Sequence, residues 1–463
     1  TRLIRWIALA AAALVLGLSA ALFFIKSPVV DGYRFIEKLD WLPELGISYH
    51  VGVDGFSLPL LLLAGLVIFS GVLVSWKVQD RPREFFSFFM FLAASVLGVF
   101  SSLDLFQLFF FFELAVFPKY LMIVMWGSPQ TRVYGGMKLT LYLFFGSVVA
   151  LEGVFALYFG SGLNTFDMLA LEKAGLPVAF QQLWFPVVFL GFAVLAGIFP
   201  FYSWAPDGHV AAPTAVSMLL AGVEMKVGAF AALRIGIQLL PQGAQEWAWL
   251  ILLLGTINVV YGALLAMAQK DLKYVIGYSS VSHMGLVLIG FATLNPDGLL
   301  GAGLQMFSHG VMTALFFAVV GMVYDRTHTR EIAKLGGLAR VMPLAAFGFI
   351  VSGLVSMGMP GFSGFVAEIP IYLGAWRVAP WVAVVSALSI VITAAYILLV
   401  VRRVFFGAQP EALGALEGIT RKDKLVILLL SLVMIAIGLL PGLLSSGIGD
   451  GVTRILHLLG GSL

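Results

Sequence analysis

Long apolar segments follow one another along almost the whole chain, and they restrict its fold more than any other feature. Residues 380–400, for example, contain no charged side chain. A helix of about 20 apolar residues crosses the hydrocarbon core of a bilayer. The chain is 61% hydrophobic and 11% charged, and a soluble protein of 463 residues needs far more polar surface than that. The sequence therefore predicts an all-α polytopic membrane protein, with residues 1–463 in a single transmembrane bundle.

Thirteen segments have the length and composition of membrane spans: residues 4–25, 56–77, 85–101, 103–126, 134–159, 181–203, 213–238, 246–268, 274–294, 300–324, 341–376, 379–403 and 424–446. The first has an arginine-rich front like that of a signal peptide, but it is too long and lacks a clear cleavage site, so we expect a membrane helix. Segment 341–376 is too long for one straight helix and contains GMPGFSG, which predicts a broken helix.

The basic residues of the loops predict the orientation. If successive segments alternate in direction, 17 of the 27 Lys and Arg residues fall on the side of Arg2 and Arg5, and 7 on the opposite side, which includes Lys26. The remaining three, Lys119, Lys138 and Lys226, lie within segments. By the positive-inside rule, the side of Arg2 is cytoplasmic.

Several kinds of chemistry are excluded for this chain acting alone. It has no cysteine, so it cannot form disulfides, thiolate zinc sites or iron–sulfur centres. We find neither a glycine-rich nucleotide loop nor a plausible Ser-His-Asp set, and the net charge of +3 does not indicate nucleic-acid binding. We therefore assign no catalytic, cofactor-binding or metal-binding residue to this chain.

Ionisable residues inside apolar segments are the candidate functional residues. They are Glu113, Lys119, Glu224, Lys226, His283, His309 and Glu368. Each costs about 2.5–3.5 kcal/mol to insert unless it faces the bundle interior, water or another charge. Burial lowers the proton affinity of a lysine and raises that of a carboxyl group, so both can gain and lose protons near neutral pH. A row of such groups therefore suits proton transfer. The alternative is a set of structural polar ties between helices.

Two of these residues, and two further ones, leave questions of geometry. Glu113 and Lys119 are about 120° apart around one helix, so they are not a direct i,i+4 pair. Lys138 lies near a helix start and could extend to the cytoplasmic surface. Glu152 could belong to a proton pathway or could tie two helices together.

Five motifs bear a resemblance to a known family: FPFYSWAPDGHVAAPTAVSMLLAGVEMKVGAF, DLKYVIGYSSVSHMGLVLIG, QMFSHGVMTALFF, YDRTHTREIAKLGGL and GMPGFSGFVAE. They resemble the antiporter-like membrane subunits of respiratory complex I, and within that family the M type of subunit. Glu368 distinguishes this type, because related subunits and the multi-subunit cation/proton antiporters typically carry lysine there.

The resemblance implies an antiporter-like fold of fourteen helices, with two inverted five-helix repeats that each contain a broken helix. The repeats would span residues 85–238 and 246–403, with breaks near Pro200 and Gly361, and the family's first helix would be absent from the chain as numbered. It also implies that Glu113, Lys226, His283, His309 and Glu368 form the proton path, and that Lys138 matches a lysine often found at that helix start.

One position departs from the family pattern. The family usually has a lysine in the first broken helix, paired with the Glu113-type carboxylate, and Leu195 stands there in this chain. We hypothesise that Lys119 takes over the pairing with Glu113, directly or through water. The alternative is that Lys119 extends toward the cytoplasmic surface and takes no part in pumping. Glu224 is a second intramembrane charge to which the family assigns no role.

The resemblance implies a proton-translocating subunit of a complex I-type NADH:quinone oxidoreductase in a bacterial inner membrane. Redox cofactors are expected in partner membrane subunits and none in this chain. Two alternatives stay open: a subunit of a multi-subunit sodium/proton antiporter, and a weakly pumping scaffold subunit of a membrane-bound hydrogenase.

Overall fold

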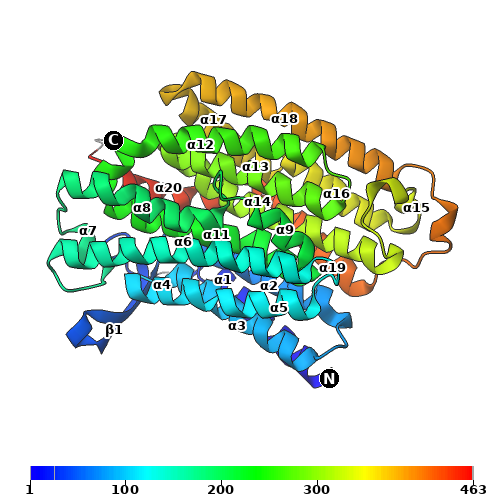
Figure 1. The fold of residues 1–463 in the computed structure, drawn as a ribbon, viewed down its shortest axis with the longest axis horizontal. Coiled ribbons are helices and arrows are strands. Elements are labelled where there is room, and N and C mark those ends of the chain that lie inside the picture. The colour runs from blue at the N-terminus through cyan, green and yellow to red at the C-terminus, as the bar shows by residue number, and fades with distance from the viewer. Residues whose placement is uncertain (1, 26, 461–463) are drawn as a thin grey trace.

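The computed structural model describes residues 2–25 and 27–460, and its helices lie side by side along the longest axis of the molecule (Figure 1). Eleven helical stretches of these residues are long and apolar enough to cross a membrane. They are α1 (Arg2–Ala21), α2 (Ser57–Val74) with η2 (Ser75–Lys77), α3 (Pro82–Ser101), α4 (Leu105–Leu114) with α5 (Val116–Trp126), α6 (Arg132–Ser161), α8 (Val178–Ala196), α10 (Thr214–Leu219) with η3 (Leu220–Glu224), α11 (Met225–Ala231) and η4 (Ala232–Ile237), α12 (Pro241–Met267), α13 (Leu272–Ala292), α14 (Pro296–Thr327), and α18 (Pro380–Val400) with η6 (Val401–Phe405).

The two other predicted spans are interrupted helices. Segment 341–376 is divided into α16 (Pro343–Ser356) and α17 (Ser363–Val378), as predicted. The prediction of one span over 424–446 was wrong, because α19 (Arg421–Leu439) ends before a 67° bend into α20 (Gly442–Leu458). Pro441 explains the bend, since a proline disfavours helical geometry in the residue before it, and Leu440 has left the helical region.

Short elements connect the spans: β1 (Arg34–Leu42), η1 (Pro43–Leu45), β2 (Ile47–Val53), α7 (Met168–Glu172), α9 (Trp204–Ala211), η5 (Ile332–Lys334), α15 (Leu338–Val341) and η7 (Glu411–Leu413). The antiparallel β1–β2 hairpin was not predicted. Asp167 caps the start of α7 and also accepts a hydrogen bond from Lys38 of β1, which anchors the hairpin. Burial raises the pKa of Asp167, but hydrogen bonds from His50 and Lys38 outweigh that effect and hold the pKa below its usual range.

Three helices form the centre of the bundle. The membrane-spanning part of α14 and the whole of α10–η4 are buried, and α13 is almost entirely buried. By contrast, α1, α6 and α18 leave most of their surface exposed. Four of the seven predicted ionisable residues lie on these three central helices. A fifth, Glu368, lies on α17, which packs closely against α14.

The first break lies between α8 and α9, around Pro200 as predicted. Gly197 ends α8 in the left-handed region, at φ 82°. Non-helical backbone at membrane depth needs partners for its peptide groups. Asn258 of α12 supplies them: its Oδ1 accepts from the Phe199 amide at 2.6 Å, and its Nδ2 donates to the Gly197 carbonyl at 2.7 Å.

The second break lies between α16 and α17, around Gly361 as predicted. Gly358 and Gly361 both have positive φ, at 61° and 90°. A Cβ on Gly358 would meet Glu368 Oε2 at 2.7 Å, so the turn lies directly against that carboxyl group. The break therefore brings the start of α17, and Glu368 with it, into the bundle.

Gly364→Ala is expected to destabilise this second break. A Cβ there would lie 2.0 Å from the Val355 carbonyl oxygen of α16, and overpacking of this kind costs about 1–3 kcal/mol. Thermal unfolding of the purified protein in detergent measures the effect. Gly17→Ala in α1 is the matched control, because nothing lies within 4 Å of its Cβ position. Equal melting temperatures for the two variants would contradict the packing described here.

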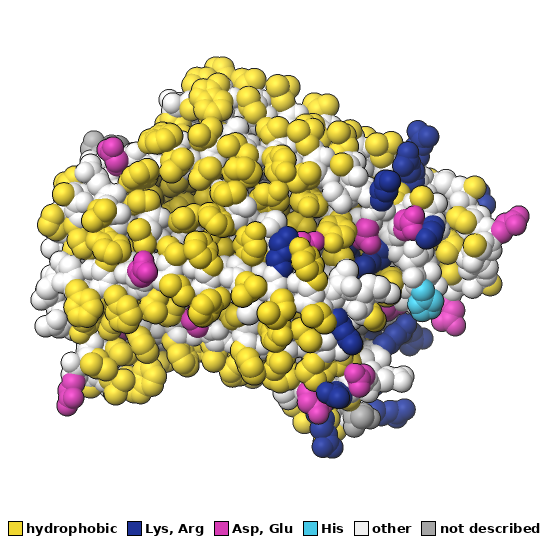
Figure 2. Space-filling model, in the orientation of Figure 1, with side chains coloured by type: hydrophobic (Ala, Val, Ile, Leu, Met, Phe, Trp, Pro, Cys, Tyr) yellow, Lys and Arg dark blue, Asp and Glu magenta, His cyan; other side chains and the backbone are white. Residues whose placement is uncertain are grey.

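The outer surface is mainly apolar. Figure 2 shows one face covered by hydrophobic side chains, with Lys and Arg gathered at the end that carries α15 and the N-terminus. That end is the predicted cytoplasmic side. Of the residues counted on the opposite side, Lys26 lies outside the described residues, and Arg234 is buried in η4, where it pairs with Asp54 at 2.8 Å.

Candidate functional site

A buried ion pair joins the α4–α5 helix to the centre of the bundle. Lys119 Nζ lies 2.8 Å from Glu224 Oε2, and neither side chain is more than 1% exposed. Lys119 follows Pro118 in the first turn of α5, and Glu224 ends the π-helical turn η3. The other oxygen of Glu224 has no hydrogen-bond partner. The pair is therefore fully desolvated, and only one of the two carboxylate oxygens is satisfied.

Glu113 does not take part in this pair. Within the described residues, no ion pair joins it to Lys119, and its Oε1 is buried without a hydrogen-bond partner. The side chain lines an outward-facing groove of about 630 Å³ formed by phenylalanines of α3, α4 and α5. The hypothesis that Lys119 pairs directly with Glu113 is thus not supported. The helical offset between the two residues turns Lys119 inward and leaves Glu113 at the edge.

Lys226 lies at the centre of the site. Its ammonium group is 2.5 Å from the Ala221 carbonyl and 2.8 Å from His309 Nδ1, and the side chain is fully buried. Lys226 comes two positions after Glu224, so the two side chains leave the helix in different directions, as predicted. The adjacent π turn is a local irregularity of a kind that often marks functional positions.

Two stacked histidines continue the row. The rings of His309 on α14 and His283 on α13 lie 5.4 Å apart with an interplanar angle of 28°. His283 Nδ1 is 3.2 Å from the Gln305 amide and 3.4 Å from Glu368 Oε1, and its Nε2 is 2.9 Å from Ser356 Oγ. His283 can therefore exchange a proton with a carboxyl group on one side and a hydroxyl group on the other.

Glu368 ends the row on α17. Besides His283, it contacts the Tyr372 hydroxyl, one helical turn further along, at 3.5 Å. The buried groups from Lys119 to Glu368 thus lie in a band that crosses the bundle through α5, η3, α11, α14, α13 and α17. The band has two contacting sets, Lys119 with Glu224, and Lys226 through the two histidines to Glu368. Among the described residues no side-chain hydrogen bond or ion pair joins Glu224 to Lys226, and the two sets share only the η3–α11 helix.

Sequence reasoning missed His209 of α9. It is completely buried, and neither ring nitrogen has a hydrogen-bond partner. Its ring packs against Phe317 and Trp204, with centroid distances of 5.4 and 6.2 Å. A histidine in an apolar segment was the available signal, but α9 was predicted as part of the connection between spans.

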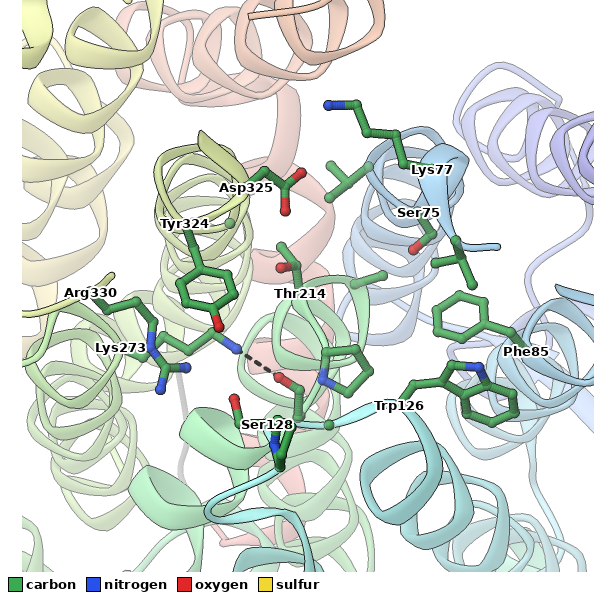
Figure 3. A pocket seen from close by; sticks show the side chains of 18 residues that line it. Ser75, Lys77, Phe85, Trp126, Ser128, Thr214, Lys273, Tyr324, Asp325 and Arg330 are labelled. Carbon is green, nitrogen blue, oxygen red and sulfur yellow. Dashed lines mark hydrogen bonds between the residues drawn. The ribbon is translucent and has the colours of Figure 1, made fainter. Parts of the chain in front are cut away.

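A pocket of about 390 Å³ opens at the predicted cytoplasmic end, between α2, α5, α10 and α14 (Figure 3). Lys273 lies in its wall. The ammonium group donates to the Ala212 carbonyl at 2.7 Å, drawn dashed in Figure 3, and to Ser217 Oγ at 3.0 Å. Since Thr214 and Ala215 of α10 line the pocket, it touches the same long helix that carries Glu224 and Lys226.

Lys138 and Glu152, the two remaining predicted positions, lie outside this band. Lys138 is partly exposed and pairs with Asp207 of α9 at 2.7 Å, and Tyr274 bonds the same carboxylate at 2.9 Å. Glu152 is exposed on α6 and has no hydrogen bond or ion pair among the described residues. The structure thus gives Lys138 a partner within the bundle and places Glu152 on its outer face; a role of either residue in a proton pathway stays a prediction.

Comparisons with known proteins agree with the geometry. The family described as NADH:quinone oxidoreductase/Mrp antiporter, transmembrane, matches residues 102–393. The chain is 38% identical to NAD(P)H-quinone oxidoreductase chain 4 1 of Synechococcus sp. (strain JA-3-3Ab), over 96% of this chain and 86% of that protein. It is 36% identical to NADH-quinone oxidoreductase subunit M of Rhodobacter capsulatus, over 98% and 90%.

Solved structures give the same result for the fold. A chain of respiratory complex I from Thermus thermophilus superposes with a TM-score of 0.92 at 30% identity, over 99% of this chain and 96% of that chain. A chain of the Mrp complex from Dietzia sp. DQ12-45-1b has a TM-score of 0.88 at 22% identity, over 99% and 95%, and shows likeness of fold alone. The resemblance inferred from the motifs is confirmed.

Proposed function

We propose that this chain, which belongs to the NADH:quinone oxidoreductase/Mrp antiporter transmembrane family, is a proton-translocating membrane subunit of a complex I-type NADH:quinone oxidoreductase. Its place is a bacterial inner membrane, where it packs against other membrane subunits. Redox chemistry in those partners drives the protons, because this chain offers only acid–base groups.

The row of buried ionisable groups carries the proposal. Lys226 Nζ lies 2.8 Å from His309 Nδ1, the rings of His309 and His283 stack with their centroids 5.4 Å apart, and His283 Nδ1 lies 3.4 Å from Glu368 Oε1. Proton transfer needs steps of hydrogen-bond length or one intervening water. A row of charges at membrane depth is costly and is by default functional. Polar contacts that only hold helices together would not require a lysine and two histidines in direct spatial succession.

The pocket beside Lys273 supports uptake from the cytoplasmic side. Its volume of about 390 Å³ is many times the roughly 10–15 Å³ that one water needs, so the pocket has room for several waters. Lys273 donates to the His209 backbone carbonyl at 3.3 Å, and the buried His209 ring nitrogens without a hydrogen-bond partner suit a relay through water. In this proposal protons pass inward by Lys273 and His209, load Lys226, and leave by way of Glu368.

The two breaks support the proposed repeats, residues 85–238 and 246–403. Each proposed repeat contains one interrupted span, and interrupted helices are where transporters of this architecture handle ions.

One observation favours a second candidate, a weakly pumping scaffold subunit. The side chain at 195 is a buried leucine, so the first half of the chain lacks the family's lysine. A sodium/proton antiporter subunit has less support, since the relatives at 36–38% identity are quinone oxidoreductase chains.

Glu368→Gln tests the proposal. Glutamine keeps the shape of the side chain but cannot take up a proton, so we expect NADH-driven acidification of reconstituted vesicles to fall about 100-fold or more along this route. Identification of the co-purified chains accompanies the measurement. Unchanged acidification, with the complex intact, favours the scaffold; co-purification with antiporter subunits alone would overturn the proposal.

A further inference from the structure

Glu152 is a carboxylate on the outside of the bundle. The exposed face of α6 forms a stripe at helical spacing, and every other large side chain in it is apolar or aromatic: Tyr134, Met137, Leu141, Phe144, Val148, Phe155 and Phe159. Figure 2 shows this side of the molecule, where isolated acidic side chains interrupt the hydrophobic surface away from the basic end. Glu152 is the acidic member of the α6 stripe.

The depth of Glu152 makes its exposure costly. The 30 residues of α6 extend about 45 Å at 1.5 Å per residue. Glu152 lies nine residues before Ser161, or about 14 Å from that end. With a hydrocarbon core of about 30 Å centred on the helix, the carboxylate lies about 6 Å inside it. Phe155 and Phe159, both further toward the end, are exposed aromatics that suit lipid or a membrane interface.

The proposed proton route does not use this residue. Glu152 makes no hydrogen bond or ion pair with any described residue, and it lies on the opposite face of α6 from the helices that α6 packs against. A carboxylate within hydrocarbon is stable when it meets a cation or is otherwise satisfied. What satisfies Glu152 must therefore come from outside this chain.

We infer that the α6 stripe is the docking surface for a transmembrane helix of a different subunit, which places a lysine or arginine against Glu152. The inference rests on the proposed function for the existence of neighbouring subunits. Charge complementarity selects the occupant: the apolar stripe provides contact area, and the single carboxylate sets the depth and rotation of the partner helix.

A second copy of this chain does not provide the cation. Its intramembrane Lys119 and Lys226 are buried and bonded internally. Arg377, exposed at the end of α17, is paired with Asp297. Arg402 and Arg403 lie at the end of α18, outside the depth of Glu152.

Dicyclohexylcarbodiimide, an apolar reagent that modifies carboxyl groups within membranes, tests the inference. The complex is treated in its native membrane and again after detergent separates the subunits, and Glu152 modification is measured by mass spectrometry. We expect protection in the intact complex and several-fold more modification after separation. Glu246, exposed near the start of α12, reports the reagent dose. Equal modification of Glu152 in both states would mean that it faces lipid and would overturn the inference.

Two variants give an independent measurement. Glu152→Lys should lower the fraction of this chain retained in the purified complex by about tenfold, because like charges facing each other across an interface suppress association. Glu152→Gln should lower it less, and Glu246→Lys not at all. If Glu152→Lys is fully retained in the complex, the inference is wrong, whether or not the complex pumps protons. If the wild-type chain co-purifies with no other subunit, the proposed function itself is wrong.

Discussion

Lys226→Ala is expected to reduce proton translocation through this chain about 100-fold or more. The lysine links the α11 helix to His309 by a contact of 2.8 Å, and removal of a positioned proton-transfer group costs about 100- to 10,000-fold. The loss should appear as NADH-driven acidification of vesicles containing the assembled complex. Since electron and proton transfer are coupled, quinone reduction should slow with it.

Lys226→Arg separates proton transfer from charge. Arginine keeps the positive charge but does not release its proton in proteins, so the variant should be as inactive as Lys226→Ala. Lys173→Ala is the control, because that lysine is 68% exposed and pairs only with Asp31 at the surface. If Lys226→Arg pumps at the wild-type rate, Lys226 contributes a fixed charge and the route must pass elsewhere.

Lys119→Met is expected to have the second largest effect, and on stability as well as pumping. The substitution leaves Glu224 as an unpaired charge with no exposure, and breaking a buried ion pair from one side costs about 3–5 kcal/mol. The protein should melt at a lower temperature, and less of it should assemble. Methionine fills much of the space of lysine, so lost packing is a minor part of the effect.

The double variant Lys119→Met/Glu224→Gln distinguishes the two roles of the pair. With both charges removed, stability should return close to that of the wild type, since an uncharged pair has no desolvation to compensate. Pumping should not return if the pair takes part in proton transfer. Recovery of both would make the pair a structural tie. Leu195→Lys in the Lys119→Met background tests whether a lysine at the family's position restores part of the pumping.

The membrane-spanning helices follow from the sequence because the bilayer imposes a simple local rule. A segment of about 20 apolar residues must be helical in hydrocarbon, whatever surrounds it, since each peptide group needs a partner. The break near Gly361 was predictable for a related reason: proline and glycine in GMPGFSG change the backbone locally. The break near Pro200 was expected only from the family resemblance. The β1–β2 hairpin was missed because it lies outside the apolar segments, where this rule has no force.

Partners across the bundle could not be read from the sequence in the same way. Glu113, Lys119 and Glu224 were all visible as intramembrane charges, but which two would meet depended on how α5 rotates against η3. Helix rotation is set by the packing of many side chains from distant segments, so Lys119 turned inward to Glu224 while Glu113 stayed at an outer groove. The same packing made Lys138 an internal partner of Asp207.

The sequence by itself determined that this chain crosses a membrane many times and places ionisable groups inside it, because hydropathy and the cost of a buried charge are properties of single segments. Only the tertiary structure decided the order in which those groups touch: Lys226 to His309, then His283, then Glu368. It also decided that Glu152 faces outward and that His209 is buried without a bonding partner. These contacts join residues up to about a hundred positions apart in the sequence, and no local pattern contains them.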